Sequence, residues 1–177
     1  RQLKQHATLR VIPVVVLTVP QSPVQRDRAA GIAAVIAMPF TGFELVNVVS
    51  SMHQAALAAN DGIRSTMVVV YAPKGGVGKT TVAFNLAVAL GQGGTRTALV
   101  DGSLQFGDLR SLLRVPADAP SILDLPTDRI GESDLEDVLW RDPSGIDILL
   151  APPRVEMAEM VSVRDMEKAL SLLRRLY

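Results

Sequence analysis

The stretch TMVVVYAPKGGVGKTTVAFNLAVAL, Thr66 to Leu90, decides the fold of the second half of this chain. It begins with a β-branched apolar run, Thr66–Ala72, typical of a parallel strand that is buried on both faces. A glycine-rich turn follows, and a helix is predicted from about Lys79 to Leu90. The chain has only four lysines, and two of them, Lys74 and Lys79, stand in this turn. The order of strand, glycine turn and helix is the context of a phosphate-binding loop.

Such a loop binds phosphate mainly through its backbone. Successive N–H groups point into a concavity, and the dipole of the following helix favours negative charge there. Glycines let the backbone curl closely around phosphate oxygens. The Lys79 ammonium can then reach the β- and γ-phosphates, and the Thr80 hydroxyl can ligate Mg²⁺. We therefore expect ATP or ADP with Mg²⁺ as the cofactor, and the binding residues are Lys74, Gly75, Gly76, Val77, Gly78, Lys79, Thr80 and Thr81.

The spacing of the loop departs from the common pattern G-x-x-x-x-G-K-[ST], because Pro73 stands where the first glycine should be. The loop instead reads K-G-G-x-G-K-T-T, which resembles the deviant Walker A loop of the ParA/MinD family of ATPases. The resemblance implies that Lys74 reaches across a nucleotide-sandwich homodimer to the partner's phosphates, while Lys79 binds the chain's own nucleotide. Both lysines are then catalytic candidates. The alternative is an ordinary glycine turn with two solvated lysines, which eight matching residues in the right context argue against.

Asp101 is the third catalytic candidate. It ends the predicted strand RTALVD, Arg96–Asp101, and ligands of open parallel sheets bind at the carboxyl ends of strands. The ParA/MinD resemblance implies that Asp101 holds Mg²⁺ through water, as the first aspartate of a D-x-D pattern. The second aspartate is replaced by Ser103, which cannot take a proton from the attacking water at neutral pH. We therefore expect weak or absent ATP hydrolysis. A strand-end cap is the alternative role for Asp101.

The rest of the second half, residues 66–177, is predicted to complete part of a parallel sheet with helices on both faces. Short helices are expected near 108–113 and 133–140, a third strand at 145–151, and a terminal helix over 163–176. In that helix Met166, Leu170 and Leu173 follow helical spacing and are expected to face the core.

The first half, residues 1–59, has the order strand, helix, strand, helix. The strands are predicted at 11–19 and 33–38, and the first helix at 22–31. A capping box of Thr41 and Glu44 opens the second helix, which runs through about Ala58. This order favours a second parallel α/β sheet. Residues 60–65, with the turn sequence Asn-Asp-Gly, form the predicted linker.

This first half resembles the end of a flavodoxin-like response-regulator receiver domain. IPVVVLTVP matches the fourth receiver strand with its switch threonine, Thr18, and MPF matches the K-P-F signature. The lysine of that signature is Met38, which cannot pair with a phosphoaspartate. The resemblance therefore implies a degenerate receiver that serves as a docking or dimerisation surface and runs no ordinary phosphorelay. A generic α/β fragment is the alternative.

Three further segments indicate which branch of the ParA/MinD family the chain resembles. LQFGDL, SILDL and GIDILLAPPRVEMAE are similar to the CpaE/TadZ branch of the ParA/MinD family, the bacterial pilus-assembly ATPases. The resemblance covers about residues 66–177. It implies a cytoplasmic SIMIBI-class protein that pilus or secretion proteins recruit to a cell pole or the inner membrane.

The two ends of the sequence predict that it is part of a longer protein. The first residues, RQLKQHATLR, stand in mid-pattern, and ALSLLRRLY stops before the Walker B strand that the family has next. We expect a longer protein, with the Walker B and adenine-binding residues further on.

Composition excludes several kinds of site. Cysteine is absent, which excludes thiolate chemistry, and the presence of only two histidines argues against a multi-histidine metal site. Lysine plus arginine balances aspartate plus glutamate at 18 each, which gives no electrostatic argument for nucleic-acid binding. The most apolar run, Val11–Val19, is far shorter than the roughly 20 residues of a membrane helix.

Three functions are consistent with these features. The first is an ATP-dependent dimerisation switch that positions pilus or secretion machinery. The second is a DNA-partitioning ATPase of the ParA type, against which the neutral charge and the receiver-like half argue. The third is a non-hydrolysing response-regulator output module, which Ser103 favours.

Overall fold

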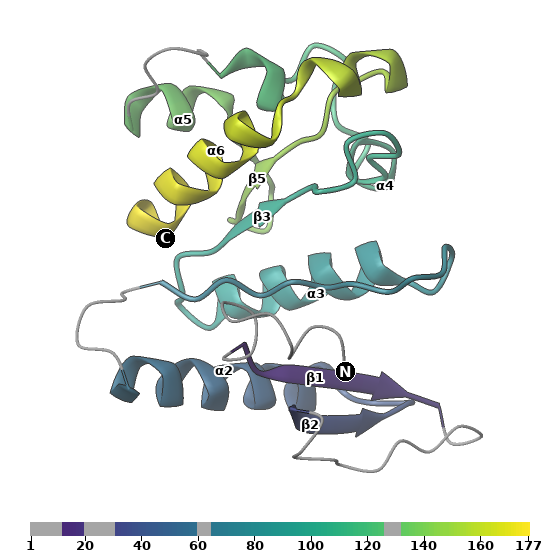
Figure 1. The fold of residues 1–177 in the computed structure, drawn as a ribbon, viewed down its shortest axis with the longest axis vertical. Coiled ribbons are helices and arrows are strands. Elements are labelled where there is room, and N and C mark those ends of the chain that lie inside the picture. The colour runs from purple at the N-terminus through teal and green to yellow at the C-terminus, as the bar shows by residue number, and fades with distance from the viewer. Residues whose placement is uncertain (1–11, 20–30, 60–64, 126–131) are drawn as a thin grey trace. The chain divides into compact units, whose positions relative to one another are not determined.

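The computed structural model describes residues 12–19, 31–59, 65–125 and 132–177. The chain divides into two compact units, Arg1–Asp61 and Gly62–Tyr177. Figure 1 shows the elements of both units along the colour ramp from the N-terminus to the C-terminus.

The first unit contains two parallel strands and one long helix. Strand β1, Val14–Thr18, pairs in parallel with β2, Ile32–Ala37, and helix α2 spans Gly42–Ala59. The parallel pairing predicted from the sequence is confirmed, although β1 is shorter than predicted and β2 begins and ends one residue earlier than predicted. The helix predicted at 22–31 lies outside the described residues.

The predicted capping box at the start of α2 is confirmed. The Glu44 carboxylate accepts a hydrogen bond from the backbone N–H of Thr41 at 2.7 Å, and the Thr41 hydroxyl accepts one from the N–H of Glu44 at 3.2 Å. These bonds satisfy N–H groups that have no partner within the helix. The hydrogen bonds that the Glu44 carboxylate accepts from the Thr41 backbone N–H and from the Thr41 hydroxyl also hold the pKa of Glu44 below its usual range.

The second unit is built on a small mixed sheet. Strand β3, Ala98–Val100, pairs in parallel with β5, Asp147–Leu149, and the short strand β4, Trp140–Arg141, pairs with β5 in the antiparallel direction. The strands at 96–101 and 145–151 are thus confirmed in shortened form. Strand β4 is new, because Trp140 was expected to end a helix.

Helices surround this sheet at the predicted places. Helix α3 spans Lys79–Gln92, α4 Leu109–Leu112, α5 Glu132–Val138 and α6 Val163–Leu176. Two 3₁₀ helices that the sequence did not predict, η1 (Ile122–Asp124) and η2 (Val155–Met160), complete the unit.

Helices cover both faces of the sheet, as predicted. Leu149 faces a core cluster with Leu135 of α5 and Leu173 of α6. Its neighbour Ile148 faces the opposite cluster, with Ala87 of α3. Adjacent residues of one strand point to opposite faces, so each side of β5 has its own core. Met166 also packs against the first cluster, so the expected core-facing side of α6 is confirmed for Met166 and Leu173.

The second core cluster brings α3 very close to the turn before β5. A Cβ added at Gly91 would lie 2.8 Å from Cγ2 of Ile146, closer than real Cβ contacts. Trp140 is half-buried and packs against this same cluster.

The strand predicted at Thr66–Ala72 is not formed, so this prediction is wrong. The segment has no assigned strand pairing, and Val69 and Tyr71 are 75% and 78% exposed. A strand that is apolar on both faces needs neighbours to pair with and helices to cover it. Among the described residues, the three-stranded sheet β3-β5-β4 does not include it.

Within the same described ranges, no helix is long and apolar enough to cross a membrane.

Candidate functional site

The glycine-rich loop joins segment Thr66–Ala72 directly to α3. Gly76 and Gly78 have positive φ angles of 70° and 84°, which side-chain-bearing residues rarely adopt. Gly78 is the N-cap of α3, and its carbonyl accepts the first helical hydrogen bond from Val82 N–H at 2.9 Å. No side chain caps this helix end. Its first N–H groups therefore keep their capacity to bind an anion.

The two lysines of the loop lie in different environments. Lys79 is half-buried, and its ammonium donates a hydrogen bond to the carbonyl oxygen of Lys74 at 3.2 Å. The side chain of Lys74 is exposed. In the described part of the chain, neither lysine forms an ion pair with a carboxylate. Two uncompensated cations beside a helix N-terminus make a site that fits a polyphosphate.

The threonines that follow complete the first turn of α3. Thr80 is half-buried and Thr81 is exposed. The Thr81 carbonyl accepts a hydrogen bond from the side-chain amide of Asn85 at 2.8 Å. A role for the Thr80 hydroxyl as a Mg²⁺ ligand stays a prediction.

Asp101 follows β3 directly and is 8% exposed. One carboxylate oxygen accepts a hydrogen bond from Ser103 N–H at 3.1 Å, and the other accepts one from Leu109 N–H at 3.4 Å. Burial raises the pKa of Asp101 above its usual range. The two backbone hydrogen bonds oppose that rise, and the charge of Asp108 adds to it.

These contacts match the alternative role that the sequence left open for Asp101. The carboxylate fastens the loop after β3 and the first residue of α4, as a strand-end cap would. A role in holding Mg²⁺ through water stays a prediction. In Figure 1 the glycine-rich loop and the carboxyl end of β3 lie at the same end of the unit, where a parallel sheet binds its ligands.

Gly107 shows how tightly this loop is held. A Cβ added there would lie 2.6 Å from Cβ of Ala151 and 3.1 Å from Oδ2 of Asp101. The backbone at Gly107 therefore passes between Asp101 and Ala151, the second residue after β5, with no room for a side chain.

Arg110 is a positioning residue that the sequence did not reveal. Its guanidinium donates hydrogen bonds to the carbonyl oxygens of Ala151, Pro116, Ala119 and Pro120 at 3.4, 3.3, 2.8 and 3.2 Å. It thus ties the loop after α4 to the end of β5. Burial lowers the pKa of the guanidinium, and the charge of Asp124 opposes this. Carbonyl acceptors leave no trace in a sequence, so no pattern could have identified this role.

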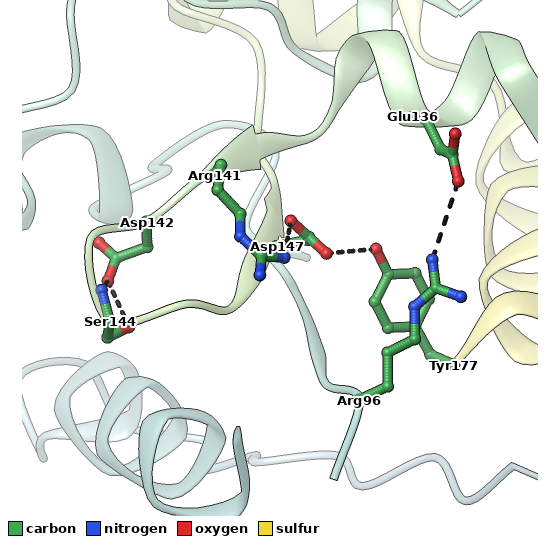
Figure 2. A network of polar contacts seen from close by, with 7 residues as sticks. All are labelled: Arg96, Glu136, Arg141, Asp142, Ser144, Asp147 and Tyr177. Atoms are coloured by element: carbon green, nitrogen blue, oxygen red, sulfur yellow. Dashed lines mark hydrogen bonds and ion pairs between the residues drawn. The ribbon is translucent and has the colours of Figure 1, made fainter. Parts of the chain in front are cut away.

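A second polar cluster lies at Asp147, the amino end of β5 (Figure 2). Asp147 accepts hydrogen bonds from Arg141 at 2.7 Å and from the Tyr177 hydroxyl at 2.6 Å. The guanidinium of Arg96 lies over the Tyr177 ring, 4.7 Å from its centroid, and 3.8 Å from Glu136. This cluster connects α6 to the sheet.

Metal ligands are not clustered in the described part of this unit. No group of three or more histidine, aspartate or glutamate side chains suited to a metal ion occurs among the described residues. A metal ion at the glycine-rich loop would need oxygen ligands from its own nucleotide, as Mg²⁺ sites of phosphate-binding loops have.

Comparison with known proteins agrees with this geometry. Residues 68–177 match the family model described as the CobQ/CobB/MinD/ParA nucleotide-binding domain. The chain is 26% identical over 106 residues to an uncharacterized ATP-binding protein of Methanocaldococcus jannaschii. The aligned region covers 60% of this chain and 39% of the relative. It is 41% identical over 90 residues to a protein of Guillardia theta described as the septum site-determining protein MinD, covering 49% of this chain and 31% of the relative.

A second uncharacterized ATP-binding protein of M. jannaschii is 30% identical over 83 residues, covering 47% of this chain and 30% of the relative. The chain thus spans between about a third and two fifths of the length of these relatives.

Proposed function

This chain belongs to the CobQ/CobB/MinD/ParA nucleotide-binding family, and we propose that its Gly62–Tyr177 unit is an ATP-dependent dimerisation switch. ATP with Mg²⁺ binds the loop from Lys74 to Thr81. Lys79 holds the β- and γ-phosphates, Thr80 ligates Mg²⁺, and Asp101 contacts the metal through water.

One observation carries the proposal: the two lysines of the loop are used differently. The ammonium of Lys79 already bonds to its own loop, while the side chain of Lys74 is exposed. An exposed cation next to a phosphate site is free to meet the phosphates of a second subunit. Pairing of two chains then strengthens the binding of a nucleotide that Lys79 already holds.

Hydrolysis is expected to be slow, because Ser103 provides no carboxylate near the attacking water. The dimer is then a long-lived state whose lifetime nucleotide exchange or a partner sets. In such a switch the nucleotide-bound dimer carries the function, whereas in a metabolic enzyme the reaction product does.

Sedimentation of the full chain tests the dimer. The samples contain ADP–Mg²⁺, ATP–Mg²⁺, or ATP–Mg²⁺ with Lys74→Ala, and Lys168→Ala is the control for loss of a lysine elsewhere in the unit. We expect a dimer with ATP in the wild type and in Lys168→Ala, and a monomer in Lys74→Ala. The same mass in every sample would refute the cross-subunit role of Lys74.

The cellular task we propose is positioning of pilus or secretion machinery in a bacterial cytoplasm, at a pole or the inner membrane. The similarity to a septum site-determining protein supports a positioning role, and the segments LQFGDL and SILDL support the CpaE/TadZ branch. The Arg1–Asp61 unit serves as a degenerate receiver that docks partners or dimerises. A fluorescent fusion of the protein should form a focus at the cell pole, and Lys79→Ala should abolish that focus. An unchanged focus in Lys79→Ala would contradict the positioning role.

A second candidate function is a non-hydrolysing output module that keeps nucleotide for stability alone. The replacement of the second D-x-D aspartate by Ser103 favours it. This candidate predicts that nucleotide raises the melting temperature equally in the wild type and in Lys74→Ala. It also predicts that nucleotide leaves the sedimentation mass of both proteins unchanged. Salt-sensitive DNA binding would instead select a partitioning ATPase.

A further inference from the structure

A hollow of about 410 Å³ lies between the loop after β3 and the 3₁₀ helix η2. Its lining residues come from two distant parts of the sequence: Gly102, Ser103, Leu104, Gln105, Phe106, Ala158 and Glu159. The function proposed above uses Asp101 and the glycine-rich loop and leaves this hollow unexplained.

Large apolar side chains stand exposed in the lining of the hollow and at the two ends of η2. Phe106, which lines it, is 69% exposed, and the two ends of η2, Val155 and Met160, are 53% and 70% exposed. Residues three apart share a face of a 3₁₀ helix, so Val155 lies on the face of Ala158. Exposed apolar groups gathered at a concave surface are typical of a binding site.

The charge at this surface is acidic. Glu159 contributes the only charged side chain of the lining. Glu156 shares the helical face of Glu159, and Asp108 follows the loop directly; both are exposed. Arg154 alone carries the opposite charge at the start of η2. A segment that places lysine or arginine beside an apolar side chain complements this pattern.

The wall of the hollow is anchored to Asp101. Ser103 N–H donates to Asp101 Oδ1 at 3.1 Å, and Phe106 N–H donates to the Ser103 carbonyl at 3.1 Å. Through these two bonds the position of Phe106 depends on the Asp101 carboxylate. If Asp101 accepts hydrogen bonds from water on Mg²⁺, that water competes with Ser103 N–H for the same oxygen atoms.

We propose that this hollow docks a basic, apolar segment of a partner protein, and that the bound nucleotide sets its affinity through Asp101. The nucleotide dependence rests on the proposed function, whereas the docking surface itself does not. Phe106 supplies the apolar contact, and Glu159 supplies the charge that recognises a lysine or arginine of the partner.

The test uses a fluorescein-labelled synthetic amphipathic helix of leucine and lysine as the probe, and fluorescence anisotropy as the readout. The same peptide with glutamate in place of lysine controls for apolar binding alone. The protein variants are Phe106→Ser and Glu159→Gln. Their matched controls are Phe43→Ser, a phenylalanine of the other unit that is 75% exposed, and Glu167→Gln on the exposed side of α6.

We expect the lysine peptide to bind the full chain without nucleotide. Phe106→Ser should weaken binding about tenfold, as loss of an aromatic anchor does, and Glu159→Gln about threefold. Phe106→Leu should restore most of the loss, and the two control variants should bind like the wild type. Equal affinity in Phe106→Ser and Phe43→Ser, or equal binding of both peptides, would overturn the docking site.

The nucleotide dependence has its own readout. Binding of a fluorescent ATP analogue is first measured on the same samples, and the peptide affinity is then compared between ADP–Mg²⁺ and a slowly hydrolysed ATP analogue with Mg²⁺. A difference of about threefold or more that disappears in Asp101→Asn supports the coupling. Equal affinities in a protein that binds both nucleotides would refute it. Failure to bind nucleotide would refute the proposed function and leave the docking result standing.

Discussion

The ammonium of Lys79 donates a hydrogen bond to the carbonyl oxygen of Lys74, 3.2 Å away. This bond closes the loop on itself across its glycines. We expect a phosphate that enters the loop to take over the Lys79 ammonium, so that the Lys74 carbonyl loses its hydrogen-bond donor. The two lysines are thus connected through one backbone group before any second subunit is present.

The first prediction separates the two lysines by nucleotide binding. Charge-assisted hydrogen bonds contribute about 1.5–3 kcal/mol, so Lys79→Ala should weaken binding of a fluorescent ATP analogue about 10- to 100-fold. At protein concentrations that keep the chain monomeric, Lys74→Ala should bind the analogue within about threefold of wild type. A similar loss in both variants would mean that Lys74 binds the nucleotide of its own chain.

A second prediction concerns the conformation of the loop without nucleotide. Gly78 has a φ of 84°, and a side chain there costs about 1–2 kcal/mol, so Gly78→Ala should lower the free energy of unfolding by about that amount. Gly75 lacks a positive φ, and a Cβ there meets no atom within 4 Å, so Gly75→Ala is the matched control. Urea unfolding measures both, and equal stabilities would contradict the left-handed conformation.

The third prediction tests the close passage at Gly107. Gly107→Ala forces a Cβ to within 2.6 Å of Ala151 Cβ, and such overpacking costs about 1–3 kcal/mol. Gly102→Ala, in the same loop, meets no atom within 4 Å and should leave stability nearly unchanged. Thermal unfolding of both variants provides the comparison. If Gly102→Ala proves as destabilising as Gly107→Ala, the close contact with Ala151 does not explain the effect, since the lower entropy of the unfolded chain would stabilise both variants.

A fourth prediction concerns the phenol of Tyr177. Burial, and then the hydrogen bond to Asp147, raise the pKa of Tyr177 to about 12. The chain has two tyrosines, so Tyr71→Phe leaves Tyr177 as the only one for titration by absorbance at alkaline pH. Asp147→Asn should lower this pKa toward about 10, the ordinary value for tyrosine.

The sign of the effect on stability follows from that pKa. The neutral phenol is favoured in the folded state, so stability should fall as pH rises from the unfolded pKa near 10 through about 12. Arg96 acts in the opposite direction, because its charge lowers the pKa of Tyr177. Arg96→Gln should therefore raise the pKa further, and a fall in that variant would contradict the geometry of Figure 2.

The fifth prediction restores a carboxylate at position 103. Ser103→Asp should raise the ATP hydrolysis rate if the missing second aspartate limits it, by about 10²-fold or more as for a positioned general base. Its charge also lies near buried Asp101 and should raise the Asp101 pKa further. Ser103→Asn, which has the same shape without the charge, is the control. Equal rates in Asp and Asn variants would show that water activation does not depend on this position.

Helix bounds could be predicted accurately where the capping residues and the apolar periodicity indicated the same helix. Helix α6 has the predicted bounds, because the Ser162 hydroxyl accepts a hydrogen bond from Asp165 N–H and its apolar residues keep helical spacing up to Leu176. The glycine loop also follows from the sequence, since only a few residue types tolerate the backbone angles of Gly76 and Gly78.

Features that depend on distant contacts could not be predicted in the same way. The Thr66–Ala72 run has the composition of a buried strand, yet it forms no ladder with the described sheet. Strand β4 has only two residues, too few for a periodic pattern, and is held by pairing with β5. The role of Arg110 depends on carbonyl groups that every residue carries.

Trp140 has a practical consequence. It is the only tryptophan of the chain, and it packs against the cluster that joins α3 to β5. Intrinsic fluorescence therefore reports on the Gly62–Tyr177 unit and is silent about the Arg1–Asp61 unit, whereas far-ultraviolet circular dichroism sees the helices of both. A denaturation curve recorded with both signals measures whether the two units melt as one cooperative block or in succession.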